Sequence, residues 1–136
     1  MHEVTVTTSI VEAEEIDRIN ILRASLLAMN RALRQLSPAP DHVLVDGNQI
    51  SSTEWRQTAI VKGDALSFSI ATASVVAKVT RDRIMFKYDA CYPHYGFAQH
   101  KGYGTPQHLA ELVKHGPCAI HRRSFSPIKP VNLELF

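Results

Sequence analysis

The sequence has few of the features that mark secreted, membrane-spanning or fibrous proteins. Only two of its 136 residues are cysteines, which is too few for a disulfide framework, and we expect Cys91 and Cys118 to be buried or half-buried thiols of a reducing cytosol. Its longest apolar runs, such as residues 70–77, are too short to cross a bilayer. Residues 1–3 place no basic stretch ahead of an apolar one, so no signal peptide is visible. These absences predict a soluble cytoplasmic protein that does not enter a membrane.

Several common catalytic and metal-binding motifs are also absent. The sequence contains no Gly-x-x-x-x-Gly-Lys-Ser/Thr phosphate loop and no Gly-x-Ser-x-Gly nucleophile elbow. None of the seven histidines has the paired spacing with cysteine that is typical of zinc sites. We therefore expect neither a nucleotide triphosphatase, nor a serine hydrolase, nor a zinc protein.

The residues that are present have an ordinary globular composition and an uneven charge. Hydrophobic residues make up 45% and charged residues 21%, and 136 residues suffice for one domain with a core. Residues 1–60 hold 5 Lys and Arg against 8 Asp and Glu, whereas residues 61–136 hold 10 against 5. A basic C-terminal half fits a phosphate-bearing partner, and it equally fits a solvated surface.

Apolar strands alternate with helical patterns, which is typical of an α/β fold. The patterns predict strands at residues 4–10, 43–47 and 58–64, and helices at 12–36, 67–88 and 106–115, with a loop rich in glycine and aromatic residues at 92–104. The first helix carries an apolar stripe at spacings of three and four residues, and the last is bounded by Thr105, Pro106 and Gly116.

Two carboxylates stand where apolar strands end. Asp46 follows Val43-Leu44-Val45, and Asp64 follows the run at residues 58–63. Because α/β folds place ligands at the carboxyl ends of their strands, two such carboxylates could converge on Mg²⁺ or Mn²⁺. The alternative is that both aspartates cap turns, as Asp beside Gly commonly does.

Two further segments could contact nucleic acid. Residues 92–103 interleave aromatic, basic and glycine residues, which can stack on bases or sugars and meet phosphate. The alternative is a surface loop whose aromatic side chains pack inward. His121-Arg122-Arg123 could grip phosphate or could be a solvated face.

These strings occur in an order and spacing that resemble bacterial ribonuclease HII. The resemblance runs from about residue 10 to residue 128, and its strongest parts are residues 15–22, 43–48, 62–64, 69–82, 95–103 and 121–125. It implies an RNase H-like mixed sheet flanked by helices. It also implies an endonuclease that cuts the RNA strand of RNA–DNA hybrids, and cuts 5′ of a ribonucleotide embedded in duplex DNA, using Mn²⁺ or Mg²⁺.

The resemblance also implies roles for particular residues. Asp46 and Asp64 correspond to two of the family's four metal-binding carboxylates, and Tyr103 corresponds to the tyrosine that packs on the sugar beyond the ribonucleotide. With them we group the basic residues of the matching strings as nucleic-acid contacts: Lys62, Lys101, Arg122 and Arg123.

The sequence departs from the family at one essential place. It contains no Asp-Glu-x-Gly-Arg-Gly, the motif that supplies the other two carboxylates from the first strand, and Glu14-Glu15 lies in a helical stretch instead. Smaller departures are Thr72, where Ala is usual, and Gly104, where Pro is usual. We therefore expect residues 1–136 to be a single domain that lacks its N-terminal strands.

Three interpretations remain open. The first is an endonuclease, monomeric when full length, of which this chain is a part. The second is an inactive fragment that retains at most nucleic-acid binding, and the third is an unrelated α/β binding domain. A sheet without its first strands would expose an unpaired edge, so we expect poor solubility or folding that depends on a partner.

Overall fold

The computed structural model describes residues 3–49 and 54–128. Its described part contains a two-stranded parallel sheet, in which β1 (His42–Asp46) pairs with β2 (Arg56–Ile60). The register aligns His42 with Arg56 and Asp46 with Ile60, so both strands end at the same edge. The α/β class is confirmed.

In the described residues the helices are α1 (Ala13–Ile19), α2 (Ile21–Arg34), α3 (Gly63–Leu66), α4 (Phe68–Cys91), α5 (Phe97–His100) and α6 (Pro106–His115). Side-chain caps begin α4 and α6, and the cap of α6 is the expected one. Ser67 accepts a hydrogen bond from the Ile70 amide at 3.4 Å, and Thr105 accepts one from the His108 amide at 3.2 Å. Gly116 ends α6 with a φ of 71°, which glycine adopts without strain. None of the described helices is both long and apolar enough to cross a membrane.

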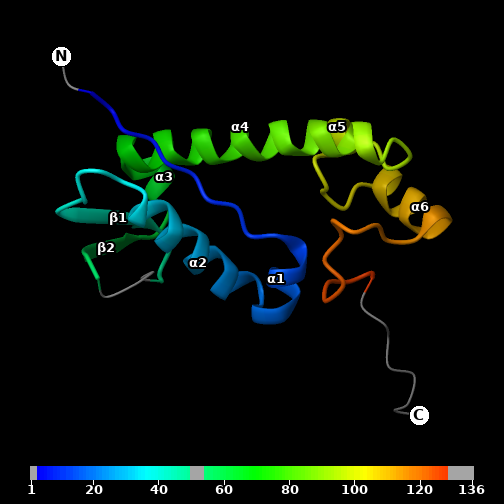
Figure 1. Cartoon of the computed structure of the whole chain (residues 1–136), viewed down its shortest axis with the longest axis horizontal. Coiled ribbons are helices and arrows are strands. Elements are labelled where there is room, and N and C mark those ends of the chain that lie inside the picture. Colours follow the sequence, from blue (N-terminus) through cyan, green and yellow to red (C-terminus); the bar gives the residue numbers. More distant parts are fainter. Residues whose placement is uncertain (1–2, 50–53, 129–136) are drawn as a thin grey trace, which may run out of the picture.

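Two expectations about the N-terminal part are wrong. The single helix at residues 12–36 is two helices, because Asn20 has a φ of 71° and its side chain caps α2 by accepting from the Arg23 amide at 3.0 Å. Residues 4–10 form no strand. A strand needs a hydrogen-bonded neighbour, and in the described part of the chain this segment is held by a side chain, through the 2.8 Å bond from Thr7 Oγ1 to the Ala32 carbonyl. The segment runs between α2 and α4 (Figure 1).

The core lies at the C-terminal end of α4. Met85, Tyr95, Phe97 and Leu112 form one buried cluster, in which the Phe97 side chain is only 1% exposed. Cys118 is half-buried against this cluster, as expected, whereas Cys91 is exposed, contrary to expectation. The packing is therefore concentrated where α4, α5 and α6 meet.

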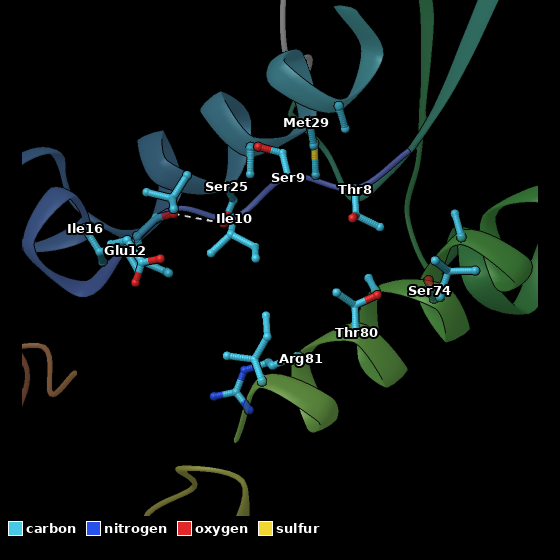
Figure 2. A pocket seen from close by; sticks show the side chains of 18 of the residues that line it. Thr8, Ser9, Ile10, Glu12, Ile16, Ser25, Met29, Ser74, Thr80 and Arg81 are labelled. Atoms are coloured by element: carbon cyan, nitrogen blue, oxygen red, sulfur yellow. Dashed lines mark hydrogen bonds between the residues drawn. The ribbon is translucent and has the colours of Figure 1, made fainter. Parts of the chain in front are cut away.

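An open cavity of about 1250 Å³ runs alongside α4 and reaches the core cluster, since Met85, Phe97 and Leu112 are among its lining residues. Residues 4–13, the apolar face of α2, all of β1 and the small residues of α4 line it, whereas no residue of β2 does. Figure 2 shows Ile10 in this cavity, with Met29 of α2 on one side and Thr80 of α4 on the other. The edge of β1 away from β2 has no paired strand among the described residues.

Candidate functional site

Asp46 ends β1 at the carboxyl edge of the sheet, and Asp64 is in α3, which begins beside that edge. Parallel pairing continues past β1, because the Gly47 amide donates to the Ile60 carbonyl at 3.0 Å. The chain that leaves β2 then turns so that the Gly63 amide donates to Asp46 Oδ1 at 2.9 Å. Asp64 is the next residue, so one hydrogen bond ties the two aspartate positions together.

Gly63 is the residue that permits this approach. A Cβ atom built at position 63 would lie 2.6 Å from Ile70 Cδ1, closer than real Cβ contacts, and 3.4 Å from Asp46 Oδ1. Lys62 precedes it in the left-handed region, with a φ of 55° and an exposed side chain. The predicted lysine is therefore at the same edge as the two carboxylates.

Both aspartates also have the hydrogen bonds that a turn-capping role predicts. Asp46 accepts from Gly63, and Asp64 Oδ1 accepts from the Ala65 amide at 3.0 Å. Both side chains nevertheless remain exposed, so carboxylate oxygens are left for another ligand. Within residues 3–49 and 54–128, no group of three or more His, Cys, Asp or Glu residues could hold a metal ion. The metal-binding role of the pair stays a prediction.

The other acidic pair, Glu14-Glu15, is in α1, and Glu15 forms ion pairs with arginine side chains. Glu15 forms ion pairs with Arg31 at 3.1 Å and with Arg18 at 3.4 Å. The Arg31 contact ties α1 to α2, whereas the Arg18 contact is within α1.

The aromatic loop at residues 92–104 satisfies both of its interpretations at different residues. Tyr95 and Phe97 point into the core and are 6% and 1% exposed, whereas Tyr103 is 66% exposed. Only Tyr103 of these three is therefore available to stack on a ligand.

Sequence reasoning missed Arg81, which is the residue that organises the Tyr103 loop. Its guanidinium lies 5.4 Å from the centre of the Tyr103 ring and donates to the Lys101 carbonyl at 2.5 Å. The predicted Lys101 is engaged with the protein, since its ammonium lies 4.2 Å from the centre of the Phe86 ring and donates to the Ala98 carbonyl. The available signal was that Arg81 belongs to the string 69–82, which is part of the family resemblance.

The basic segment near the C-terminus is held by Asp17, 106 residues away in sequence. Asp17 accepts from the Arg123 amide at 2.7 Å, the Ser124 amide at 2.9 Å and the Ser124 hydroxyl at 2.5 Å. The hydroxyl bond is the main reason why the pKa of Asp17 is lowered. Half-buried Arg122 stacks on Phe125, with its Cζ 3.9 Å from the ring centre, while Arg123 is exposed.

The candidate residues thus form two groups along α4. Asp46, Lys62 and Asp64 lie by α3, at the N-terminal end of α4, whereas α5 lies at its other end (Figure 1). The second group consists of Arg81, Lys101, Tyr103 and Arg122. Arg81 connects it, because its guanidinium contacts the Tyr103 ring and its charge acts on Arg122. The pKa of Arg122 is lowered mainly by burial and further by the charge of Arg81. Arg81 is 13 residues after Phe68, the first residue of α4, so the two groups are about 20 Å apart along the helix at 1.5 Å per residue, and a ligand that touches both must be extended.

Comparison with known proteins decides the family. The family model described as ribonuclease HII matches residues 2–128. The chain belongs to the ribonuclease HII family. It is 53% identical over 131 residues to the ribonuclease HII of Anaeromyxobacter sp. (strain Fw109-5), and 54% identical over 122 residues to that of Coxiella burnetii (strain Dugway 5J108-111). It is 53% identical over 117 residues to that of Ruminiclostridium cellulolyticum.

These matches cover most of this chain but only part of each relative. They span 92%, 90% and 86% of the chain, and 42%, 60% and 46% of the three ribonuclease HII proteins. The chain therefore spans about half the length of the curated relatives it matches. Both groups of candidate residues lie inside the stretch that matches the ribonuclease HII model.

Proposed function

We propose that this protein is an endonuclease of the ribonuclease HII type. It hydrolyses the RNA strand of RNA–DNA hybrids and cuts duplex DNA 5′ of an embedded ribonucleotide. The observation that supports the proposal is the hydrogen bond from the Gly63 amide, the residue before Asp64, to Asp46 at the carboxyl edge of the sheet. As a bacterial nuclease it would act in the cytoplasm, as a monomer when full length.

The two aspartates fit a divalent metal in chemistry but not in number. Their exposed carboxylate oxygens are the ligands that Mg²⁺ and Mn²⁺ prefer. When bound, such an ion lowers the pKa of a water molecule and polarises the scissile phosphate. The family resemblance implies four carboxylates, so Asp46 and Asp64 would supply half of the site and an Asp-Glu pair from another strand would supply the rest.

The open cavity is where we propose that the missing N-terminal strands lie. The free edge of β1 borders it, and an unpaired edge accepts a further strand. The wall that α4 contributes includes Ser69, Ala73 and Ala77, whose small side chains allow close approach of another backbone. Strands added there would complete an RNase H-like mixed sheet and would end beside Asp46.

Duplex nucleic acid is the extended ligand that would touch both groups. Exposed Tyr103 can stack on a sugar, and Arg81 and Arg122 supply positive charge next to it. Lys62 and Arg123 expose their side chains to phosphate, while Lys101 would act mainly by shaping the loop.

The test is cleavage of a 5′-labelled DNA duplex that contains one ribonucleotide. The 136-residue protein is incubated with Mn²⁺ and this duplex, and a parallel sample holds the all-DNA duplex. Product that ends 5′ of the ribonucleotide, and is lost in Asp46→Asn and in Asp64→Asn, supports the proposal. Asp41→Asn, which removes an exposed carboxylate just before β1, is the matched control and should cleave like the unmodified protein.

A second candidate is an inactive chain that binds nucleic acid, which the presence of only two of four implied carboxylates favours. In that case no product exceeds the Asp46→Asn background, yet the ribonucleotide duplex is retained in a gel-shift assay. Tyr103→Ala should then weaken retention, because the exposed ring is lost. Unchanged retention would exclude Tyr103 from the interface.

A further inference from the structure

Three buried histidines lie directly beneath the Tyr103 loop. His100, His108 and His121 come from α5, α6 and the C-terminal segment, and are 6%, 7% and 8% exposed. The rings of His100 and His108 stack with their centres 4.3 Å apart. They are the buried polar side chains of the described residues, and the proposed function uses none of them.

The partners of His108 and His121 determine which ring nitrogens carry protons. A carbonyl can only accept, so His108 Nδ1 must donate to the Tyr103 carbonyl at 2.9 Å. An amide can only donate, so His121 Nδ1 must accept from the Cys118 amide at 3.0 Å. The 3.0 Å bond between the two Nε2 atoms then runs from His121 to His108. Every hydrogen bond is satisfied only when both rings are neutral.

His100 obeys the same rule. Its Nε2 donates to the Tyr95 carbonyl at 2.6 Å, and its Nδ1 accepts from the Gly102 amide at 3.1 Å. His100 and His108 therefore hold consecutive residues of the loop, one at the Gly102 amide and the other at the Tyr103 carbonyl. A proton added to His100 Nδ1 would face the Gly102 N–H, and one added to His108 Nε2 would face the N–H of His121.

We propose that His100 and His108 are positioning residues that hold the turn at residues 101–103 only while the three rings are neutral. His121 acts through His108 by fixing its tautomer. The inference rests on the proposed role of Tyr103 in nucleic-acid binding. It predicts that acid releases the turn and weakens the grip on duplex.

The surroundings of the rings oppose protonation. Burial is the main reason why the pKa values of His108 and His121 are lowered, and neighbouring histidines lower both further. The backbone bonds to Tyr103 and Cys118 act the other way without reversing the direction. Among the described groups that face the rings, the Cys118 thiol has its pKa raised by burial, and the Tyr95 hydroxyl donates to the Gly116 carbonyl. Arg122 follows His121 in the sequence, and Arg81 of α4 is close enough for its charge to act on Arg122. Two carboxylates on the neighbouring helices have other partners: Asp89 accepts from the Ala98 amide, and Glu111 contacts His115.

The first test reads the rings without any nucleic acid. Two-dimensional ¹H–¹⁵N spectra of the imidazoles at pH 7.5 should show His108 protonated at Nδ1, and His100 and His121 protonated at Nε2. On acidification the Gly102 and Tyr103 amide signals should move together with the His108 ring signals. A different tautomer at His108, or loop signals that ignore the ring titration, would overturn the inference.

The second test measures affinity for the ribonucleotide duplex at pH 7.5 and pH 5. Added positive charge in acid would by itself strengthen phosphate binding, so a loss of affinity is diagnostic. We expect a loss of about tenfold, the change that one unit of pKa difference between free and bound states produces. His108→Asn keeps an N–H donor for the Tyr103 carbonyl without a titrating ring, so it should bind at pH 7.5 and lose less affinity in acid than the unmodified protein, and what loss remains is assigned to His100.

Three outcomes are separable. Equal loss in His108→Asn and in the unmodified protein would refute the positioning role. His94→Gln, an exposed histidine outside the trio, should lose affinity with acid as the unmodified protein does. Absence of duplex binding at both pH values would count against the proposed function, and the ring spectra would still decide the inference.

Discussion

Replacing Asp17 by alanine removes the carboxylate that anchors the basic C-terminal segment to α1. Three donors meet it, namely the Arg123 amide and the amide and hydroxyl of Ser124. They divide between its oxygens, since Arg123 uses Oδ2 and Ser124 uses Oδ1. Asparagine can therefore keep the bonds of one residue but not of both, because its amide nitrogen cannot accept.

The hydrogen bonds to Asp17 determine how much the substitution should lower the free energy of opening the C-terminal segment. A hydrogen bond to a charged group contributes about 1.5–3 kcal/mol, and partial exposure of Asp17 reduces the sum of the three to about 2 kcal/mol for local opening. Asp17→Ala should thus raise the open population of the segment about thirtyfold. Asp17→Asn should raise it about fivefold, for a loss of about 1 kcal/mol.

Trypsin measures this opening directly, because it cleaves after arginine and the segment contains Arg122 and Arg123. When opening is fast relative to cleavage, the cleavage rate follows the open population. Cleavage after Lys114, in the last turn of α6, is the reference within the same digest. Asp41→Asn removes one exposed carboxylate and should leave both rates unchanged. Equal cleavage of Asp17→Ala and the unmodified protein after Arg122 and Arg123 would refute the reasoning.

The same anchor should weaken in acid. The pKa of Asp17 is lowered in the fold, so its contribution is fully present above the ordinary aspartate pKa and is lost as pH falls through the lowered value. Hydrogen exchange of the Ser124 amide should show protection that falls between about pH 5 and pH 2. In Asp17→Asn the protection should be low and nearly independent of pH, and a parallel decline in both proteins would contradict the assignment.

Three further predictions concern the loop and the cavity. Gly102 has a φ of 81°, and a Cβ atom there would lie 3.2 Å from Met85 Cε. Gly102→Ala should therefore destabilise the loop by about 1–2 kcal/mol, as measured by the same trypsin assay. Gly104→Ala is the control and should have no such effect, because the space around Gly104 is open. The open cavity should bind an apolar naphthalene dye, and Ala73→Phe should reduce the fluorescence while Ala110→Phe, on exposed α6, leaves it unchanged. The 136-residue chain alone should be poorly soluble or need a partner to fold, and a cooperative, monomeric thermal transition would contradict this.

Local signals predicted the elements whose ends are decided locally. The bounds of α6 follow from Thr105, Pro106 and Gly116, and the cap of α4 follows from Ser67. The apolar stripe at residues 12–36 passes unbroken across Asn20, so periodicity could not reveal that the backbone leaves the helix there. The pattern at residues 4–10 is typical of a strand, but a strand exists only with a neighbour to pair with.

The candidate site also contains residues that local signals could predict and residues that they could not. The position of Asp46 at the carboxyl edge could be predicted from its strand, whereas Asp64 is in α3 and not at the end of β2, and the metal-binding role of both stays a prediction. Arg81, Asp17 and the histidine trio were missed, because each acts through a partner that is far away in sequence or belongs to another element. Composition marks such residues only as a surface arginine, a helix acid or scattered histidines.

The contact between Asp17 and Ser124 also constrains the order in which the protein can assemble. During synthesis α1 emerges early, but its carboxylate has no partner until the chain has been extended past residue 124. Closing a loop of this length costs chain entropy that local helices do not incur, so the contact should form late. The placement of Arg122 and Arg123 should thus follow the formation of the local helices, and a nascent chain that stops before residue 124 would carry its acidic helix without the basic segment that matches it.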